Sequence, residues 1–159
     1  MSPYDNGVTR FQPRLWTIGY GGRRDPAALL EPLVEAGVER LVDVRQLPLS
    51  RRPGFSKRAL AAATEEAGLI YLHVRELGTP GPIRALFRTK RDLEEGQRRY
   101  REHLEDPEVS IALEGLAADL PRARHALMCV EAEPDGCHRA LLAAALVERL
   151  PQLNVVHLI

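Results

Sequence analysis

The feature that most constrains this chain is the regular alternation of short apolar segments with stretches that carry helical patterns. The apolar segments occupy residues 15–19, 40–44, 69–74, 126–131 and 155–158. Strands that alternate with helices predict a parallel sheet with right-handed crossovers, and strands that are apolar throughout fit a sheet covered on both faces. The sequence therefore predicts an α/β fold, a three-layer Rossmann-like or flavodoxin-like domain with a mainly parallel sheet of about five strands.

Helix start signals lie between the apolar segments. Asp25-Pro26 joins a capping side chain to a first-turn proline, and residues 106–107 repeat this pairing. Pro32 lies inside the first helical pattern and is expected to kink or split that helix. Residues 75–89 contain two glycines and two prolines and predict a long loop, a kind of segment that is often functional. Further helices are expected over about 90–105 and 137–150.

The length of 159 residues fits one domain. We expect a lead-in at residues 1–13 and a single α/β domain over residues 14–159. No apolar run approaches the roughly 18 residues of a membrane span, and the start of the chain does not resemble a signal peptide. Two cysteines are too few for a secreted disulfide framework. These features predict a cytoplasmic protein without a membrane partner, and they indicate no oligomeric state.

The net charge is zero, but the charges are unevenly distributed along the chain. Residues 45–91 contain ten basic and three acidic side chains, and the remainder of the chain is correspondingly acidic. Such a segment can create a local positive potential that attracts a phosphate-bearing ligand, a nucleotide or a nucleic acid. The alternative is a set of solvated arginines without a common partner.

Residues that packing alone does not explain gather where the predicted strands end. Because ligands bind beyond the carboxyl ends of the strands in an open parallel sheet, we expect these residues to share one pocket. The candidate catalytic residues are Asp43, Glu131, Cys137 and His138. The candidate ligand-binding residues are Tyr20, Arg45, Ser50, Arg51, Arg52, Cys129 and Arg139. No metal ligands and no cofactor are expected.

Motifs at these positions resemble the domain of unknown function 488 family. They are Thr17-Ile18-Gly19-Tyr20, LVDVR at 41–45 with Pro48, SRR at 50–52, FSK at 55–57, YLH at 71–73, ELG at 76–78, CVE at 129–131 and CHR at 137–139. The last two motifs are the most specific, and the likeness extends from about residue 15 to residue 158. The resemblance implies a fold and a list of positions, and it implies no particular reaction.

The two cysteines permit three interpretations. Cys137 at a helix start could be a nucleophile, since the helix dipole and nearby cations favour a thiolate, or it could be a small buried residue. A metal site is disfavoured because seven residues separate Cys129 from Cys137, whereas paired zinc ligands usually lie two to four residues apart. In addition, adjacent Cys137 and His138 side chains would diverge in a helix.

The charged residues also permit two interpretations. Asp43 and Glu131 could act as acid and base, while Arg45 and Arg139 could hold a phosphate at a helix start. Alternatively, the four side chains could form a structural lattice of salt bridges.

Three functions therefore stay open. The first is an enzyme that acts on a nucleotide or nucleic acid through the carboxylates and arginines. The second is a non-catalytic nucleic-acid-binding module, which few aromatic side chains for base stacking make less favourable. The third is a thiol enzyme of sulfurtransferase type that uses Cys137, because residues 42–45 (VDVR) are similar to a short strand of rhodanese domains.

Overall fold

Five parallel strands form the centre of the fold. The structure is a computed structural model that describes residues 12–159, so the predicted lead-in at residues 1–13 lies almost entirely outside the described residues. The strands are β1 Arg14–Gly19, β2 Arg40–Asp43, β3 Ile70–His73, β4 His125–Cys129 and β5 Asn154–His157. They lie in the order β3-β2-β4-β1-β5, and all neighbouring strands are parallel. The predicted α/β class with a parallel sheet of five strands is confirmed.

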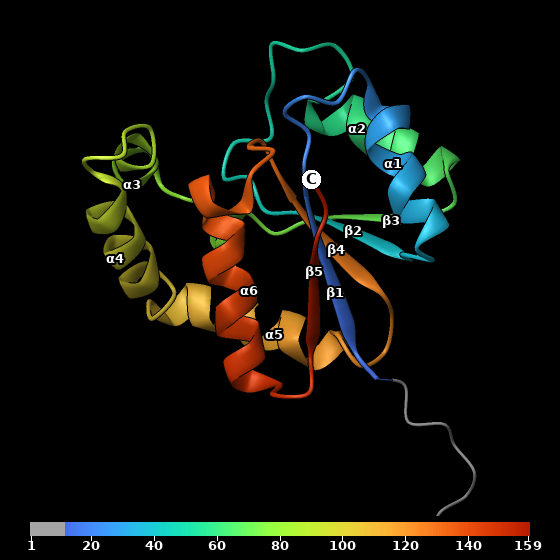
Figure 1. The fold of residues 1–159 in the computed structure, drawn as a ribbon. Helices are drawn as coiled ribbons and strands as arrows, with labels where there is room; N and C mark the ends of the chain where they lie inside the picture. Colours follow the sequence, from blue (N-terminus) through green and yellow to red (C-terminus); the bar gives the residue numbers. More distant parts are fainter. Residues whose placement is uncertain (1–11) are drawn as a thin grey trace, which may run out of the picture.

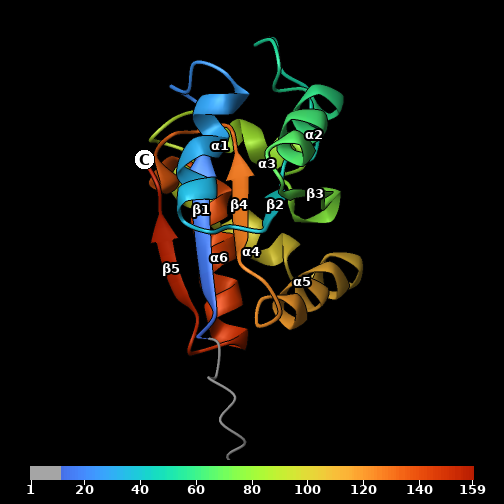
Figure 2. The same ribbon diagram turned by 90° about the vertical axis from the view of Figure 1, so that its right-hand side faces the viewer.

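Six helices within residues 12–159 cover the two faces of this sheet (Figures 1 and 2). They are α1 Pro26–Glu35, α2 Lys57–Glu66, α3 Gly81–Leu86, α4 Leu93–His103, α5 Pro107–Asp119 and α6 His138–Arg149. Helices α1 and α2 cover one face, and α5 and α6 cover the other, with α3 and α4 packed outside α6. None of the helices in the described part of the chain has the length and apolar character needed to cross a membrane.

Alternating side chains along β1 pack on both faces of the sheet. Leu15 packs in the cluster beneath α5 and α6, whereas Trp16 and Ile18 pack in the cluster beneath α1 and α2. Successive side chains of a strand point to opposite faces, so a strand between two helical layers is apolar at most of its positions. The unbroken apolar segments of the sequence have this physical cause.

Two local expectations differ from the structure. Pro32 does not split α1, which continues to Glu35 as one helix. The predicted loop at residues 75–89 is not a plain loop, because it contains a 3-10 turn at Arg75–Leu77 and then α3. Pro82 lies in the first turn of α3, where a proline has no N–H to leave unpaired and its fixed φ suits a helix.

The order of the strands differs from the two layouts named by the sequence prediction. Both the Rossmann-like and the flavodoxin-like orders place β1 beside β2, but here β4 lies between them and pairs with both. The chain leaves β2 toward the α1–α2 face and leaves β4 toward the α6 face (Figure 1). Connections that leave neighbouring strands on opposite faces open a crevice at the carboxyl edge of a sheet.

Candidate functional site

A small cavity opens at the carboxyl ends of β2 and β4. Its volume is about 110 Å³, which is far below the roughly 300 Å³ at which pockets for drug-sized ligands begin. Its walls come from residues 45–49 after β2, from residues 79–87 around α3 and from residues between 129 and 138. The predicted site residues that line it are Arg45, Cys129, Glu131, Cys137 and His138.

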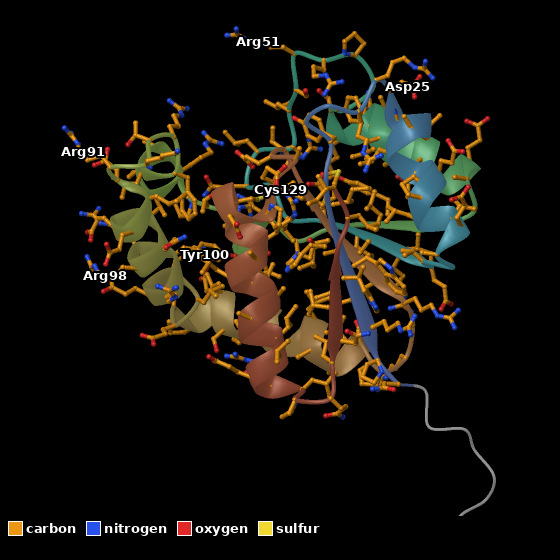
Figure 3. The ribbon with its side chains drawn as sticks, in the orientation of Figure 1. Asp25, Arg51, Arg91, Arg98, Tyr100 and Cys129 are labelled. Carbon is orange, nitrogen blue, oxygen red and sulfur yellow. A yellow bond between two sulfur atoms is a disulfide. The ribbon has the colours of Figure 1, made fainter. Side chains whose placement is uncertain are left out.

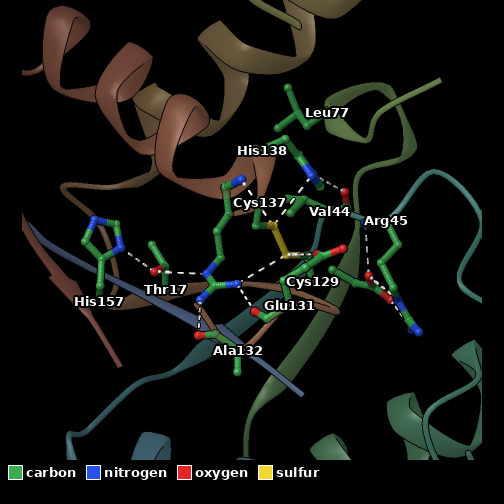
Figure 4. The surroundings of a disulfide bond; sticks show 12 residues. Thr17, Val44, Arg45, Leu77, Cys129, Glu131, Ala132, Cys137, His138 and His157 are labelled. Carbon is green, nitrogen blue, oxygen red and sulfur yellow. Dashed lines mark hydrogen bonds and ion pairs between the residues drawn. A yellow bond between two sulfur atoms is a disulfide. The ribbon is translucent and has the colours of Figure 1, made fainter. Parts of the chain in front are cut away.

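Cys129 and Cys137 meet in the cavity wall and are joined as a disulfide (Figure 4). Cys129 is the last residue of β4, and Cys137 stands directly before α6. The segment between them makes a 3-10 turn at Pro134–Gly136, which returns the chain to the end of β4. Strand, turn and helix together place two sulfur atoms beside the cavity.

Cys137 is the N-cap of α6. Its backbone is extended, with φ −134° and ψ 146°, and its Sγ accepts a hydrogen bond of 3.5 Å from the backbone N–H of Arg139. Because Cys137 lies before the helix, its side chain converges with that of the next residue, and His138 Nδ1 lies 3.7 Å from Cys137 Sγ. The expectation that the two side chains diverge assumed a helix over both residues, and it is wrong.

A backbone carbonyl fixes the orientation of His138. The Nε2 atom lies 2.9 Å from the carbonyl oxygen of Val44. A carbonyl can only accept, so Nε2 donates the proton and Nδ1 presents a lone pair toward the sulfurs. The imidazole also packs against the ring of Tyr100, with 5.1 Å between the centroids. Burial lowers the pKa of His138 to about 4, so the ring is neutral at neutral pH.

Arg139 is buried behind the sulfurs and does not line the cavity. Its side chain is 0% exposed, and burial lowers its pKa. The guanidinium donates to the carbonyls of Glu131 and Ala132, to Thr17 Oγ1 at 3.2 Å and to Cys129 Sγ at 3.4 Å (Figure 4). None of the ion pairs among residues 12–159 includes it. Its positive charge lies beside the sulfurs and the turn, where the carboxylates of Glu131 and Glu133 also act on it.

Asp43 and Arg45 form a buried ion pair below the cavity. Asp43 is 0% exposed, and its carboxylate accepts from Arg45 Nε at 2.9 Å and from Arg45 NH2 at 2.7 Å. Tyr71 also donates its hydroxyl to this carboxylate at 2.5 Å, and burial together with Asp43 raises the pKa of Tyr71. Burial opposes the charge of Arg45, but the bonds to Asp43 outweigh it and raise its pKa. Asp43 thus positions Arg45, which reaches the cavity.

The other predicted ligand-binding residues lie in or beside the loop after β2 and do not line the cavity. Arg52 donates to the carbonyl of Tyr20 at 2.9 Å and lies 5.0 Å from the centroid of the Phe55 ring. Ser50 accepts from the backbone of Arg52, which tightens the loop. Arg51 is exposed and points away from the molecule (Figure 3). These residues shape the loop, and only Arg51 is free to meet a large ligand at the surface.

Comparison with known families gives a match over most of the domain. The pattern of the family described as Domain of unknown function DUF488 matches residues 25–146. This chain belongs to the DUF488 family. No curated protein and no solved structure matches it.

Among the cavity residues of this DUF488 chain that were not predicted as site residues, Thr79, Arg84 and Phe87 come from the segment around α3. Two signals pointed to them. They lie in residues 75–89, a segment whose length is typical of functional loops, and Arg84 belongs to the basic residues of 45–91. No local pattern in this segment predicts that it folds back over the carboxyl ends of β2 and β4.

The DUF488 site thus combines two kinds of chemical group. Two sulfurs and a neutral imidazole form its inner wall, and Arg45 and Arg84 line the same cavity. The arginines favour an anionic ligand. The sulfurs can exchange electrons or bind an electrophile, and the imidazole can accept a proton.

Proposed function

We propose that this chain is a thiol enzyme that cleaves a sulfur–sulfur bond of a small anionic substrate, with Cys137 as nucleophile and Cys129 as resolving thiol. The observation that carries this proposal is the direct bond between the two cysteines in the wall of the cavity. A pair of thiols that can form a disulfide is able to donate two electrons. The place of the pair at the carboxyl edge of a parallel sheet supports a role in ligand chemistry.

The surroundings of the two sulfurs support Cys137 as the nucleophile. Cys137 Sγ receives the backbone N–H of Arg139 at the start of α6, and the helix dipole also favours a thiolate there. His138 Nδ1, at 3.7 Å, directs a lone pair toward this sulfur and fixes its surroundings. Cys129 Sγ instead lies 3.6 Å from a carboxylate oxygen of Glu131, to which a thiol can donate. That carboxylate opposes a Cys129 thiolate, which the guanidinium of Arg139 at 3.4 Å would otherwise stabilise, whereas Cys137 has no such opposing contact.

The presence of a resolving thiol supports sulfur as the electrophile. Cys137 Sγ attacks a substrate R–S–S–R′, forms a Cys137–S–S–R bond and expels R′S⁻. Cys129 Sγ then attacks Cys137 Sγ, forms the protein disulfide and expels RS⁻. The two thiols supply both electrons, and their protons pass to the released thiolates or to water. With a sulfane-sulfur donor the first adduct is a Cys137 persulfide, which is chemistry of the sulfurtransferase type.

The cavity supports a small anion as the substrate. Its volume of about 110 Å³ accommodates a compact group rather than a whole nucleotide. Arg84 is exposed at the cavity and can meet an anion directly. The guanidinium of Arg45 is buried and bound to Asp43 and to the carbonyl of Phe55, so its positive charge acts from within the wall. The exposed side chains of Leu47 and Leu49 offer apolar contacts at the rim.

The test is a stopped-flow reaction of the reduced protein with a dianionic aromatic disulfide that releases a coloured thiolate. We expect two equivalents of thiolate from the unaltered protein, at a rate on the order of 10-fold or more above that of free cysteine. Cys129→Ser should release one equivalent and keep a mixed disulfide at Cys137, which mass spectrometry identifies. Cys137→Ser should lose the fast phase. A mixed disulfide found on Cys129 instead would reverse the assignment, and a rate no higher than that of free cysteine would refute the proposal.

A matched pair of arginine variants tests the anion preference. Arg84→Glu should slow the reaction with the dianionic disulfide and leave the reaction with a neutral dipyridyl disulfide nearly unchanged, because only the charge at the cavity differs. Arg88→Glu, an exposed arginine that does not line the cavity, should change neither reaction. Equal slowing by both variants would assign the effect to the general charge of the protein.

A phosphate-bearing ligand stays as a second candidate. The observation that favours it is the pair of arginines at the cavity together with the excess of basic residues in 45–91. Binding of inorganic phosphate and of single-stranded nucleic acid to variants of Arg84 and Arg51 separates a small phosphate from a nucleic acid.

A further inference from the structure

We propose that the reduced form of this protein binds a zinc ion through Cys129 Sγ, Cys137 Sγ and His138 Nδ1. The three atoms lie within 4.8 Å of one another, and all three residues are buried. The proposal goes beyond the thiol chemistry above and does not depend on it, since it requires only that the disulfide be reduced.

The distance between the imidazole and the nearer sulfur fits a tetrahedral ion. With metal–sulfur bonds of about 2.3 Å and metal–nitrogen bonds of about 2.0–2.1 Å, neighbouring ligand atoms lie about 3.5–3.8 Å apart. His138 Nδ1 and Cys137 Sγ are 3.7 Å apart. This edge of the tetrahedron therefore needs no rearrangement. Reduction of the disulfide frees Cys129 Sγ to move to the same spacing.

His138 has the outer contact that is typical of a metal ligand. Ligating imidazoles almost always donate their second ring N–H to a carbonyl or a carboxylate, which fixes the tautomer and aims the free nitrogen at the ion. Here Nε2 donates to the carbonyl of Val44 at 2.9 Å, and Nδ1 faces the sulfurs. Tyr100 packs against the ring at its edge and restricts its rotation.

The sulfurs are prepared for the negative charge that metal binding requires. Arg139 directs its backbone N–H to Cys137 Sγ at 3.5 Å and its guanidinium to Cys129 Sγ at 3.4 Å. These donors stabilise thiolates, and the guanidinium counters the charge of the Glu131 carboxylate, which lies 3.6 Å from Cys129 Sγ. Two thiolates and an imidazole select zinc over magnesium or calcium, which prefer oxygen ligands.

The fourth coordination position faces the cavity. All three ligand residues line it, together with Glu131, so a water molecule or an anion can complete the tetrahedron. Three protein ligands with one open position are the pattern of catalytic rather than structural zinc sites. Binding converts two thiols to thiolates and releases two protons to solvent. The disulfide and the metal site therefore exclude each other, and reduction by an external dithiol is needed before the ion can bind.

The test is a titration of the full chain with Co²⁺ under a reductant that does not bind metals. We expect one ion per chain, with the intense visible bands of tetrahedral cobalt and the near-ultraviolet band of thiolate-to-cobalt charge transfer, and displacement of cobalt by zinc. The oxidised protein, an internal control without any substitution, should show neither band. His138→Asn and Cys129→Ser should weaken binding by on the order of 100-fold or more, beyond the 10–100-fold typical of outer contacts. His103→Asn, a histidine outside the cluster, should bind as the unaltered protein does.

Two results would overturn the proposal: an octahedral cobalt spectrum without the charge-transfer band, or equal binding by the reduced and oxidised protein. If His138→Asn fails to fold, the comparison of reduced with oxidised protein and of Cys129→Ser with His103→Asn still decides. The disulfide-cleavage assay is run with a chelator present. If the protein binds cobalt normally but cleaves no disulfide in this assay, only the thiol enzyme is refuted. If it cleaves the disulfide but binds no cobalt, only the zinc site is refuted.

Discussion

Arg139 shows how a residue can belong to a site without touching a ligand. The sequence places it beside a helix start, where an arginine suits a phosphate, but its guanidinium is fully buried and donates to two backbone carbonyls, to Thr17 and to Cys129. A buried cation is costly unless its donors are satisfied. Here the donors also fix the segment that joins the two cysteines. Arg139 is therefore a positioning residue for the sulfur pair.

This role predicts a contrast between two arginines of α6. Arg139→Met leaves the carbonyls of Glu131 and Ala132 without their donors, so we expect a loss of about 2–4 kcal/mol in the free energy of unfolding. Arg149→Met removes a surface contact with Glu114 and should cost less than about 1 kcal/mol. Urea unfolding of both variants measures the difference. Equal losses would mean that the buried hydrogen bonds of Arg139 stabilise the fold no more than the surface contact of Arg149 does.

The residue types of the site could be predicted, but their exposure could not. The sequence singles out Asp43, Arg45, Cys129 and Glu131 because they end strands, and strand ends of a parallel sheet are predictable from the apolar pattern. Whether a carboxylate faces a cavity or a neighbouring guanidinium depends on side-chain direction and on a partner such as Tyr71, 28 residues away. Such contacts between distant segments leave no trace in the local pattern. For this reason Asp43 was expected to be catalytic, whereas it is a buried partner of Arg45.

The segment between β4 and α6 is the element that creates the site, and it lies directly against the end of β1. Gly19, the last residue of β1, has no space for a side chain, because an added Cβ would stand 1.7 Å from the carbonyl oxygen of Glu131. That carbonyl is also held by Arg139. The close approach of β1 to this segment holds Cys129 and Cys137 in the wall of the cavity.

Gly19→Ala tests this close approach. The added methyl group must push the segment at Glu131 away from the strand, so we expect a destabilisation of about 3 kcal/mol, at the upper end of overpacking costs. The fast phase of disulfide cleavage should also be lost. Gly115→Ala is the matched control, since Gly115 lies on the exposed side of α5 with open space around it, and alanine there should stabilise the helix by about 0.5–1 kcal/mol. Thermal unfolding and the stopped-flow assay together measure both effects. Normal activity of Gly19→Ala would show that the position of the segment is not critical.

Elements with strong periodicity were predictable, and the short element between them was not. The start of α5 follows directly from a capping aspartate and a first-turn proline, and Asp106 does accept from Glu108 N at the N-cap. Helix α3 has six residues, too few for a helical pattern to show among glycines and prolines. Its stability comes from packing against α4 rather than from its own sequence, and tertiary packing cannot be read locally.

At the scale of the whole molecule, the strand order decides where the site lies. The sequence predicts five strands, yet no local feature shows that β4 inserts between β1 and β2, since this depends on the path of the 75–120 segment across one face. The insertion brings the basic loop after β2 beside the cysteines at the end of β4 and the start of α6. Of the ten basic residues in 45–91, Arg45 and Arg84 reach the cavity, while Arg51, Lys57 and Arg58 stay exposed on the loop and on α2. The basic segment is thus divided between an inner pair and an outer group.

This division predicts which anions the protein binds. Arg84→Glu changes the inner pair, and Arg51→Glu changes the outer group without disturbing the internal contacts that hold Arg52. We expect inorganic phosphate to bind the unaltered protein and Arg51→Glu equally and to bind Arg84→Glu much more weakly, because a compact anion meets only the cavity. Calorimetric titrations at two salt concentrations, with single-stranded nucleic acid as a further ligand, make the measurement. If nucleic acid binds and both variants weaken it, with the salt slope falling by about one unit for each lost phosphate contact, the outer group is the binding surface and the small-anion assignment is wrong. If the unaltered protein binds neither class of ligand, the phosphate-bearing ligand is refuted, and the sulfur chemistry alone accounts for the site.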